Sequence, residues 1–317
     1  MMENRRFGDT DLEVSPICFG PMRFANRDGS DDDVSRNGRR ALERALERGV
    51  NFIHSSYEYG TRWSMAPVLA NHPSRHDIHH VIKVPVPDRD DGGRFDAAKF
   101  RLRVEEALAE LHTDRIAVLQ HLQRARPNTD AHRLPDIDAI DEPLRETFET
   151  LRAEGKVGYL ATFPYTVTFA ESALATGTFS GLVAYYNAIE MEMARFFPAL
   201  ERSGGGFLCI RPFLAGLLTD RRADRDALPH DDRMRERSWD AAYDRLAVLR
   251  ERLGPASITR FAVRFALAHP LVASLIVGLN TEAQVDEVLD AAAEPADRAL
   301  FDRALAIFDE LGPVPVD

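Results

Sequence analysis

The fold of this chain is decided by one stretch, Gly49-Val50-Asn51-Phe52-Ile53-His54-Ser55-Ser56-Tyr57-Glu58-Tyr59-Gly60. Its apolar centre predicts a short buried strand over residues 51–55. Polar side chains follow where this strand ends, and Tyr59 comes five positions after His54. Because functional groups in barrel and open α/β proteins gather at the carboxyl ends of the strands, both residues are candidates for a site.

Strand and helix patterns alternate along the rest of the chain. Apolar runs predict eight strands, at residues 14–19, 51–55, 78–84, 116–120, 157–161, 182–185, 206–211 and 273–278. Apolar residues that return every three or four positions predict helices at 36–48, 97–111, 143–153, 167–176, 241–253 and 281–292, and a last helix that ends at residue 309. Eight βα units in about 300 residues favour a (β/α)8 TIM barrel. A Rossmann sheet is disfavoured because no GxGxxG follows the first strand.

The chain is expected to be a single α/β domain spanning residues 1–317. Three long polar connections interrupt its pattern, at residues 25–35, 124–141 and 219–237. Each follows a predicted strand and therefore lies at the carboxyl end of the sheet. Such connections are either solvated loops or lids over a substrate or cofactor, and the sequence leaves both open.

Charge and cysteine content exclude several classes of protein. The formal net charge is -11 and no basic stripe is present, which argues against nonspecific binding to nucleic acid or to an anionic membrane. The two cysteines, Cys18 and Cys209, lie in apolar runs, are too few for a disulfide framework and lack metal-ligand spacing. There is no secretory signal pattern and no run of 18 apolar residues. We therefore expect a soluble cytoplasmic protein with two buried thiols and no metal site.

The opening stretch resembles the signature of the aldo-keto reductases, Gly-(Ile/Val)-Asn-Phe-(Ile/Phe)-Asp-Thr-Ala-x-x-Tyr-Gly. Residues 5–15 resemble the short hairpin that closes the bottom of the barrel in this family. The resemblance implies a (β/α)8 barrel with an N-terminal β-hairpin. It also implies an oxidoreductase that uses a nicotinamide cofactor to reduce a small carbonyl substrate.

The resemblance assigns catalytic roles to particular residues. Tyr59 matches the tyrosine that donates the proton, and Lys83 matches the lysine that eases this transfer. His54 replaces the aspartate, so we expect Lys83 to lack a carboxylate partner. His54 itself is either a hydrogen-bonded structural residue or a direct acid-base group.

The family's histidine on the fourth strand has its counterpart in His121, which comes one residue early. A shift of one residue in a strand reverses the face on which a side chain lies. Two interpretations follow: a local irregularity brings His121 into the site, or Leu122 occupies the family position. We expect the first, because His121 still lies at the carboxyl end of its strand.

Three changes affect the expected nicotinamide site. Phe163 and Pro164 stand where the family has the serine and asparagine that bind the carboxamide, and Val183 replaces a glutamine. None of the three side chains can form these hydrogen bonds. We therefore expect weak cofactor binding, or none.

The phosphate and adenosine motifs are better kept. Residues 209–219 resemble the loop that embraces the cofactor pyrophosphate, although Arg211 replaces its serine and Ile210 its aromatic residue, and residues 275–288 resemble the adenosine site. The cofactor-binding residues expected from the resemblance are Gly20, Arg211, Leu214, Gly216, Gly278, Gln284 and Glu287. The segment between Gly278 and Gln284 contains no lysine or arginine that could bind a 2′-phosphate. The sequence therefore does not decide between NADP and NAD as the cofactor.

Three functions remain at this stage. The leading one is aldo-keto reductase-like reduction of a carbonyl, with Tyr59, Lys83, His54 and His121 around the reacting group. The second keeps these residues for acid-base chemistry without nicotinamide, such as an elimination, isomerisation or cyclisation. The third is a non-catalytic barrel that binds a ligand.

Overall fold

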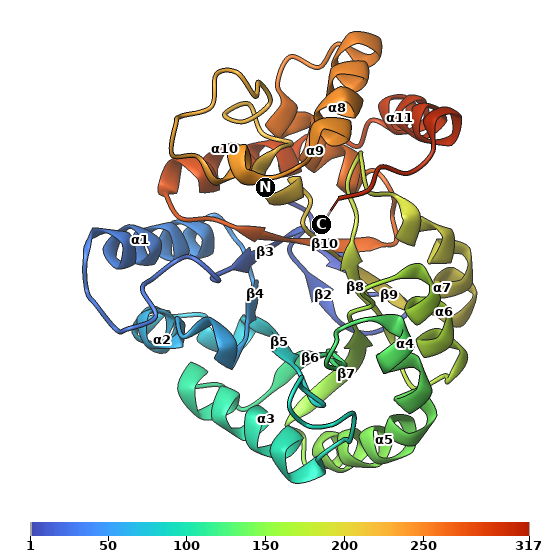
Figure 1. Cartoon of the computed structure of the whole chain (residues 1–317). Coiled ribbons are helices and arrows are strands. Elements are labelled where there is room, and N and C mark those ends of the chain that lie inside the picture. The colour runs from blue at the N-terminus through green and yellow to red at the C-terminus, as the bar shows by residue number, and fades with distance from the viewer. Residues whose placement is uncertain (1, 317) are drawn as a thin grey trace.

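Eight parallel strands close into a barrel in the computed structural model, which describes residues 2–316. Seen along the barrel axis, the strands form a central ring with the helices outside it (Figure 1). In chain order the strands are β3 (Ile17–Gly20), β4 (Phe52–Ser55), β5 (His79–Val84), β6 (Ile116–His121), β7 (Val157–Thr162), β8 (Gly181–Tyr185), β9 (Gly206–Ile210) and β10 (Val272–Gly278). The ring closes where β10 pairs with β3, which confirms the predicted TIM barrel.

Helices lie outside the ring of strands (Figure 1). They are α1 (Asp33–Glu47), α2 (Arg62–Asn71), α3 (Ala97–Leu111), α4 (Asp130–Arg133), α5 (Ile137–Ala153), α6 (Val167–Ala175), α7 (Phe197–Ser203), α8 (Asp240–Leu253), α9 (Ile258–Leu267), α10 (Glu282–Ala293) and α11 (Arg298–Leu311). Several begin at a capping side chain that accepts a backbone hydrogen bond, as Asp96 does for α3 and Thr281 for α10. Within residues 2–316, none of the helices has the length and apolar content needed to cross a membrane.

A short hairpin covers the amino-terminal end of the barrel. It consists of β1 (Arg5–Arg6) and β2 (Glu13–Val14), as predicted. Phe7 packs so tightly here that a Cβ atom on Gly206 would lie 2.3 Å from its ring. The barrel interior above is filled by one apolar side chain from each strand, namely Cys18, Phe52, Val81, Val118, Ala161, Val183, Leu208 and Ala273. Polar interior side chains are therefore displaced to the carboxyl ends of the strands.

Several predicted elements have other boundaries, among them the helix expected at 36–48, which begins at Asp33. The strand expected at 14–19 begins only at Ile17, because Val14 pairs with Arg5 in the hairpin. The helix expected at 143–153 begins six residues earlier, at Ile137, with Pro143 inside it. Ile140 and Leu144 continue the buried face across the proline, so packing outweighs the one backbone hydrogen bond that proline cannot donate. Residues 124–141 are thus partly helical.

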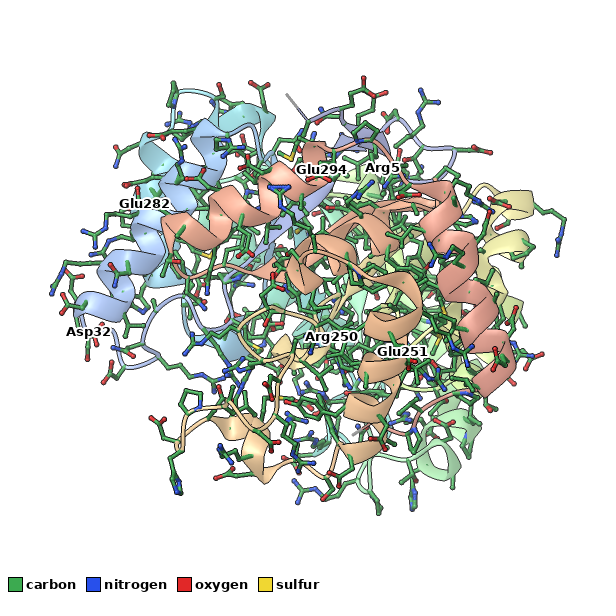
Figure 2. All side chains as sticks on the ribbon, turned by 90° about the horizontal axis from the view of Figure 1, so that it is seen from above. Arg5, Asp32, Arg250, Glu251, Glu282 and Glu294 are labelled. Carbon is green, nitrogen blue, oxygen red and sulfur yellow. The ribbon has the colours of Figure 1, made fainter. Side chains whose placement is uncertain are left out.

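Charged side chains cover the outside of the helical ring (Figure 2). Glu282 begins α10, and Glu294 directly follows this helix and lies 3.3 Å from Arg264 of α9. Asp286 of α10 lies 3.0 Å from Arg44 of α1. Exposed pairs of this kind contribute about 0–1 kcal/mol each, so the barrel is held mainly by its apolar layers.

Candidate functional site

Three predicted site residues meet at the carboxyl ends of neighbouring strands. His54 lies at the end of β4 and Lys83 at the end of β5, both on the barrel-interior face. Tyr59 follows on a short 3-10 turn, Tyr57–Tyr59, which starts where the Ser56 hydroxyl accepts from the Glu58 backbone N–H. The Tyr59 ring lies 5.6 Å from the His54 ring, centre to centre, and the Lys83 ammonium lies 4.6 Å from the centre of the tyrosine ring.

Tyr59 supplies the buried phenol of this group. Its side chain is buried apart from 9% of its surface, and burial together with the nearby Glu58 raises the pKa of its phenol. A phenol with a raised pKa is fully protonated at neutral pH and can donate its proton.

Lys83 has a carboxylate partner, contrary to expectation. Its Nζ atom lies 2.8 Å from an Oε atom of Glu58, the residue next to Tyr59. Burial lowers the pKa of Lys83, and the hydrogen bond that its ammonium donates to Glu58 opposes this change. The prediction failed because it sought the carboxylate only at position 54, whereas the turn after β4 provides one four residues later.

His54 is buried and neutral. Its Nε2 lies 2.9 Å from Oε1 of Gln120, and since this oxygen can only accept, Nε2 carries the proton. Burial lowers the pKa of His54 to about 3, and the charge of Lys83 contributes to this change. An imidazole with this pKa is uncharged at neutral pH and is a polar neutral group in the site, not a cation.

His121 does not face the site, and its predicted position is wrong. Its Nε2 lies 3.0 Å from the Val86 carbonyl oxygen, and its ring stacks on Phe179 at 5.7 Å, in the layer between strands and helices. Strand β6 is regular, with Lys83 of β5 opposite Gln120, so no irregularity turns His121 inward. Gln120 takes the interior position, and the alternation continues to Leu122.

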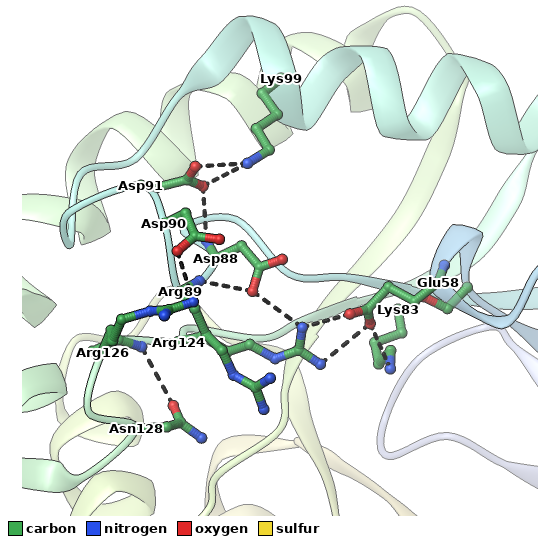
Figure 3. Close-up of polar contacts among 12 residues, drawn as sticks. Glu58, Lys83, Asp88, Arg89, Asp90, Asp91, Lys99, Arg124, Arg126 and Asn128 are labelled. Atoms are coloured by element: carbon green, nitrogen blue, oxygen red, sulfur yellow. Dashed lines mark hydrogen bonds and ion pairs between the residues drawn. The ribbon is translucent and has the colours of Figure 1, made fainter.

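An ion-pair network connects the site to the loops above it (Figure 3). Arg124, in the loop after β6, donates to Glu58 at 2.5 Å and to Asp88 at 3.1 Å. Sequence reasoning missed Glu58, Gln120 and Arg124 as site residues. Glu58 was inside the quoted motif, but Arg124 carries no local signal, because only the barrel brings its loop beside the turn after β4.

Aromatic side chains occupy the position expected to hold the nicotinamide carboxamide. Phe163 lies 4.8 Å from the Tyr165 ring and 5.2 Å from the Tyr185 ring, both edge to face. Phe163 and Pro164 are both buried and neither can form the amide hydrogen bonds of the family.

The predicted pyrophosphate loop has an unusual backbone. Arg211, Leu214 and Ala215 adopt positive φ angles of 63°, 45° and 54°, a region that non-glycine residues seldom occupy. Gly216 follows with φ 104°, and a Cβ there would lie 2.4 Å from the Arg222 guanidinium. Such strained backbone is concentrated at functional sites.

Arg211 lies between aromatic and acidic partners. Its guanidinium stacks over Tyr185 at 4.6 Å and lies 3.0 Å from Glu190. Asn187 donates to the same carboxylate at 2.7 Å. Burial is the largest effect on Glu190 and raises its pKa to about 7, so this carboxyl titrates near neutral pH.

The predicted adenosine-side residues lie where β10 meets β3. Gly20 and Gly278 are paired across these strands, and a Cβ on Gly20 would lie 2.9 Å from the Val277 carbonyl oxygen. Gln284 lies in the first turn of α10, where its Oε1 accepts from the Asn280 backbone N–H at 2.9 Å. Glu287 is exposed on α10.

An open cavity of about 310 Å³ lies at the opposite, amino-terminal end, lined by side chains that include Asp11, His79, Arg115 and Tyr159. None of the predicted site residues lines it. The assignment of the site therefore rests on the side chains at the carboxyl ends of the strands.

Comparisons with known proteins agree with this geometry. The model of the Aldo/keto reductase family matches residues 16–307. L-galactose dehydrogenase from Arabidopsis thaliana is 24% identical over 308 residues, covering 92% of this chain and 89% of the relative. The uncharacterized oxidoreductase YqkF from Bacillus subtilis is 24% identical over 303 residues, covering 92% and 91%.

Solved structures share the fold. The holo form of the aldo-keto reductase AKR11C1 from Bacillus halodurans superposes with a TM-score of 0.75 at 24% identity, over 97% of this chain and 96% of that one. The glycerol dehydrogenase AKR11B4 from Gluconobacter oxydans gives 0.74 at 21% identity, over 99% and 98%. With the family match over nearly the whole length, the chain belongs to the aldo/keto reductase family of oxidoreductases.

Proposed function

We propose that this protein interconverts a small carbonyl compound and its alcohol with a nicotinamide cofactor, using Tyr59 as the proton donor. One observation carries the proposal: Tyr59 lies beside a paired lysine at the carboxyl end of an aldo/keto reductase barrel. The family match favours this function over acid-base chemistry without nicotinamide and over a non-catalytic barrel.

The chain fits one end of a nicotinamide dinucleotide better than the other. At the phosphate end, two guanidinium groups surround the loop before Gly216, since Arg222 and Arg233 lie 3.5 and 3.1 Å from the Ala215 carbonyl oxygen. Guanidinium groups suit phosphate oxygens. At the ring end, Phe163 and Pro164 provide contact surface but no amide hydrogen bond. These residues would hold the phosphates firmly and the ring loosely.

The chemistry at the site follows from the protonation states. A nicotinamide cofactor, when bound, would supply the hydride that the carbonyl carbon accepts. Tyr59 donates its phenolic proton to the carbonyl oxygen, and the Lys83 ammonium stabilises the phenolate that remains. His54, neutral and held by Gln120, presents a fixed polar surface beside the reacting oxygen.

The relatives and the polar side chains of the site support a first choice of substrates to test. One relative is named L-galactose dehydrogenase. The first panel of substrates therefore contains L-galactose and other sugars, together with simple aldehydes. Both NADH and NADPH enter the assay, because the adenosine-side segment does not distinguish them.

The test is turnover of this panel by wild-type protein and by Tyr59→Phe. Consumption or formation of reduced nicotinamide by the wild type, lost in the variant, supports the proposal. If neither cofactor is turned over with any substrate in either direction, the proposal fails.

A further inference from the structure

We propose that Glu58 replaces the carboxylate missing from position 54 by orienting Lys83 against Tyr59, and that Arg124 is the positioning residue that keeps Glu58 in place. The inference rests on the proposed function, because it concerns how that same site orients its lysine. It assigns a role to Glu58, which stands at an unspecified position of the family signature, and to Arg124, which lies outside that signature.

Glu58 and Tyr59 are adjacent on one rigid turn. The Ser56 side chain caps this turn, and Gly60 ends it with φ 62°. One carboxylate oxygen of Glu58 lies 2.8 Å from Lys83 Nζ, while the lysine ammonium lies 4.6 Å from the centre of the Tyr59 ring. The turn thus fixes the acid and the partner of its lysine together.

Arg124 holds the other side of the same carboxylate. Its Nη1 lies 2.5 Å from Oε1 of Glu58 and its Nη2 lies 3.2 Å from Oε2, a two-pronged pair. Arg124 is itself anchored by Asp88 at 3.1 Å, by the Tyr165 hydroxyl at 3.3 Å and through its backbone N–H by the Pro87 carbonyl at 2.9 Å. Both oxygens of Glu58 are therefore used, and its rotamer is fixed.

The loop that carries Asp88 is itself held by side-chain contacts. The Asp88 backbone N–H donates to Asp91 at 2.8 Å, and Asp91 pairs with Lys99 of α3 at 2.7 Å (Figure 3). Positive and negative charges alternate from Lys83 through Glu58 and Arg124 to Asp88. The charge of Lys83 is therefore balanced without a carboxylate at position 54.

Burial separates this network from an ordinary surface ion pair. The side chains of Lys83, Glu58 and Arg124 expose only 14%, 24% and 12% of their surface. Removing one partner from a shielded pair leaves an uncompensated charge, whereas removing an exposed partner changes little. Asp90 and Arg126, exposed by 83% and 70% in the same region, provide the matched control pair.

The chain is well suited to a direct test, because it contains only three lysines, Lys83, Lys99 and Lys156. Protein labelled with ¹³C at the lysine ε-carbon gives three signals, and Lys83→Arg identifies the one from Lys83. The pH titration of that signal is followed in the wild type, in Glu58→Gln and in the control Asp90→Asn. This measurement requires neither cofactor nor substrate.

Glu58→Gln should lower the pKa of Lys83 by about one unit or more, because the neighbouring negative charge is lost. The basic limb of the kcat/KM pH profile should move to lower pH by the same amount, since the uncharged lysine no longer stabilises the tyrosinate. Asp90→Asn should leave both unchanged. His54→Asp, added to Glu58→Gln, should return the pKa of Lys83 toward its wild-type value.

Arg124 is tested by non-additivity. If Arg124 acts through Glu58, Arg124→Gln should lower kcat/KM in the wild type and have little further effect in Glu58→Gln. Additive losses in the double variant would contradict the positioning role.

The failures of the two proposals are distinguishable. A Lys83 signal that titrates alike in the wild type and Glu58→Gln overturns the inference, whatever the activity. A shifted titration without nicotinamide turnover leaves the inference standing and rejects the proposed function. Should Glu58→Gln not fold, Glu58→Asp, whose shorter side chain draws the carboxylate away from Lys83, replaces it with the same expected direction.

Discussion

The imidazole of His54 and the side-chain amide of Gln120 are hydrogen-bonded across the barrel interior, 2.9 Å apart, although their strands are separated by β5. Lys83, at the end of that intervening strand, lies in register with Gln120. Because the imidazole is neutral and donates from Nε2, Gln120 determines its orientation. The polar residue of the fourth strand in this site is therefore Gln120, while the adjacent His121 packs on the other face.

Gln120 and His121 give a matched pair of variants on one strand. Gln120→Leu leaves the buried His54 N–H without an acceptor, which costs about 1–3 kcal/mol, and should lower kcat/KM roughly tenfold or more. His121→Phe should change kcat/KM by less than about threefold and act only on thermal stability. The reverse ranking in steady-state kinetics would mean that His121, and not Gln120, serves the site.

Tyr59 and Tyr57 give a second matched pair. Tyr59→Phe keeps the ring and removes the proton, so kcat should fall about 100-fold or more. Tyr57 stacks under Arg103 at 4.0 Å, away from Lys83, and Tyr57→Phe should leave kcat nearly unchanged. Equal activity of both variants would reject Tyr59 as the acid and direct attention to His54.

Cofactor affinity should respond to the aromatic cluster. NADPH should bind the wild type only weakly, with a dissociation constant above the submicromolar range. Phe163→Ser combined with Pro164→Asn should tighten binding about tenfold, because each regained hydrogen bond is worth roughly 0.5–1.5 kcal/mol. The control is Phe163→Ala with Pro164→Ala, which opens the cluster without adding polar groups. Equal affinities of the two double variants, by nicotinamide fluorescence, would contradict this account.

Restoring aspartate at position 54 alone should not create a strong aldehyde reductase. Lys83 already has a carboxylate in Glu58, and a loosely held ring forfeits positioning that can be worth roughly 7 kcal/mol or more. His54→Asp should therefore show no large gain in NADPH consumption with generic aldehydes. A strong gain from this single change would show that the ring was already well held.

Buried histidines should make the fold sensitive to acid. Burial lowers the pKa of His54 to about 3 and those of His80 and His121 to about 4. These residues take up protons near pH 6.5 only when the chain unfolds, so their stabilising effect is complete above this pH and declines as the pH falls toward their folded values. Each should cost about 1.4 kcal/mol per pH unit in that window.

Melting temperatures between pH 7.5 and 5 test this linkage. His121→Phe should reduce the slope of unfolding free energy against pH by the contribution of about one proton. Equal slopes in His121→Phe and the wild type would show that His121 does not contribute to the pH dependence of the unfolding free energy.

The sequence predicted the fold best where the pattern of apolar and polar residues is compatible with only one kind of element. The eight strands followed from apolar runs, and the hairpin followed from the resemblance of residues 5–15 to the hairpin of the family. The face of β6 could not be predicted, because Ile116 to Leu119 are apolar on both sides of the strand and give no alternation. The carboxylate partner of Lys83 also escaped prediction, since Glu58 comes beside Lys83 only when β4 pairs with β5.

The central claim, hydride transfer with Tyr59 as acid, is tested most directly by isotope transfer. The protein is incubated with reduced cofactor carrying two deuterium atoms at nicotinamide C4 and with the substrate that turns over best, and the alcohol is analysed by mass spectrometry. The account predicts one deuterium on the former carbonyl carbon with the wild type and almost none with Tyr59→Phe. Product without deuterium, or equal transfer by Tyr59→Phe, would contradict it.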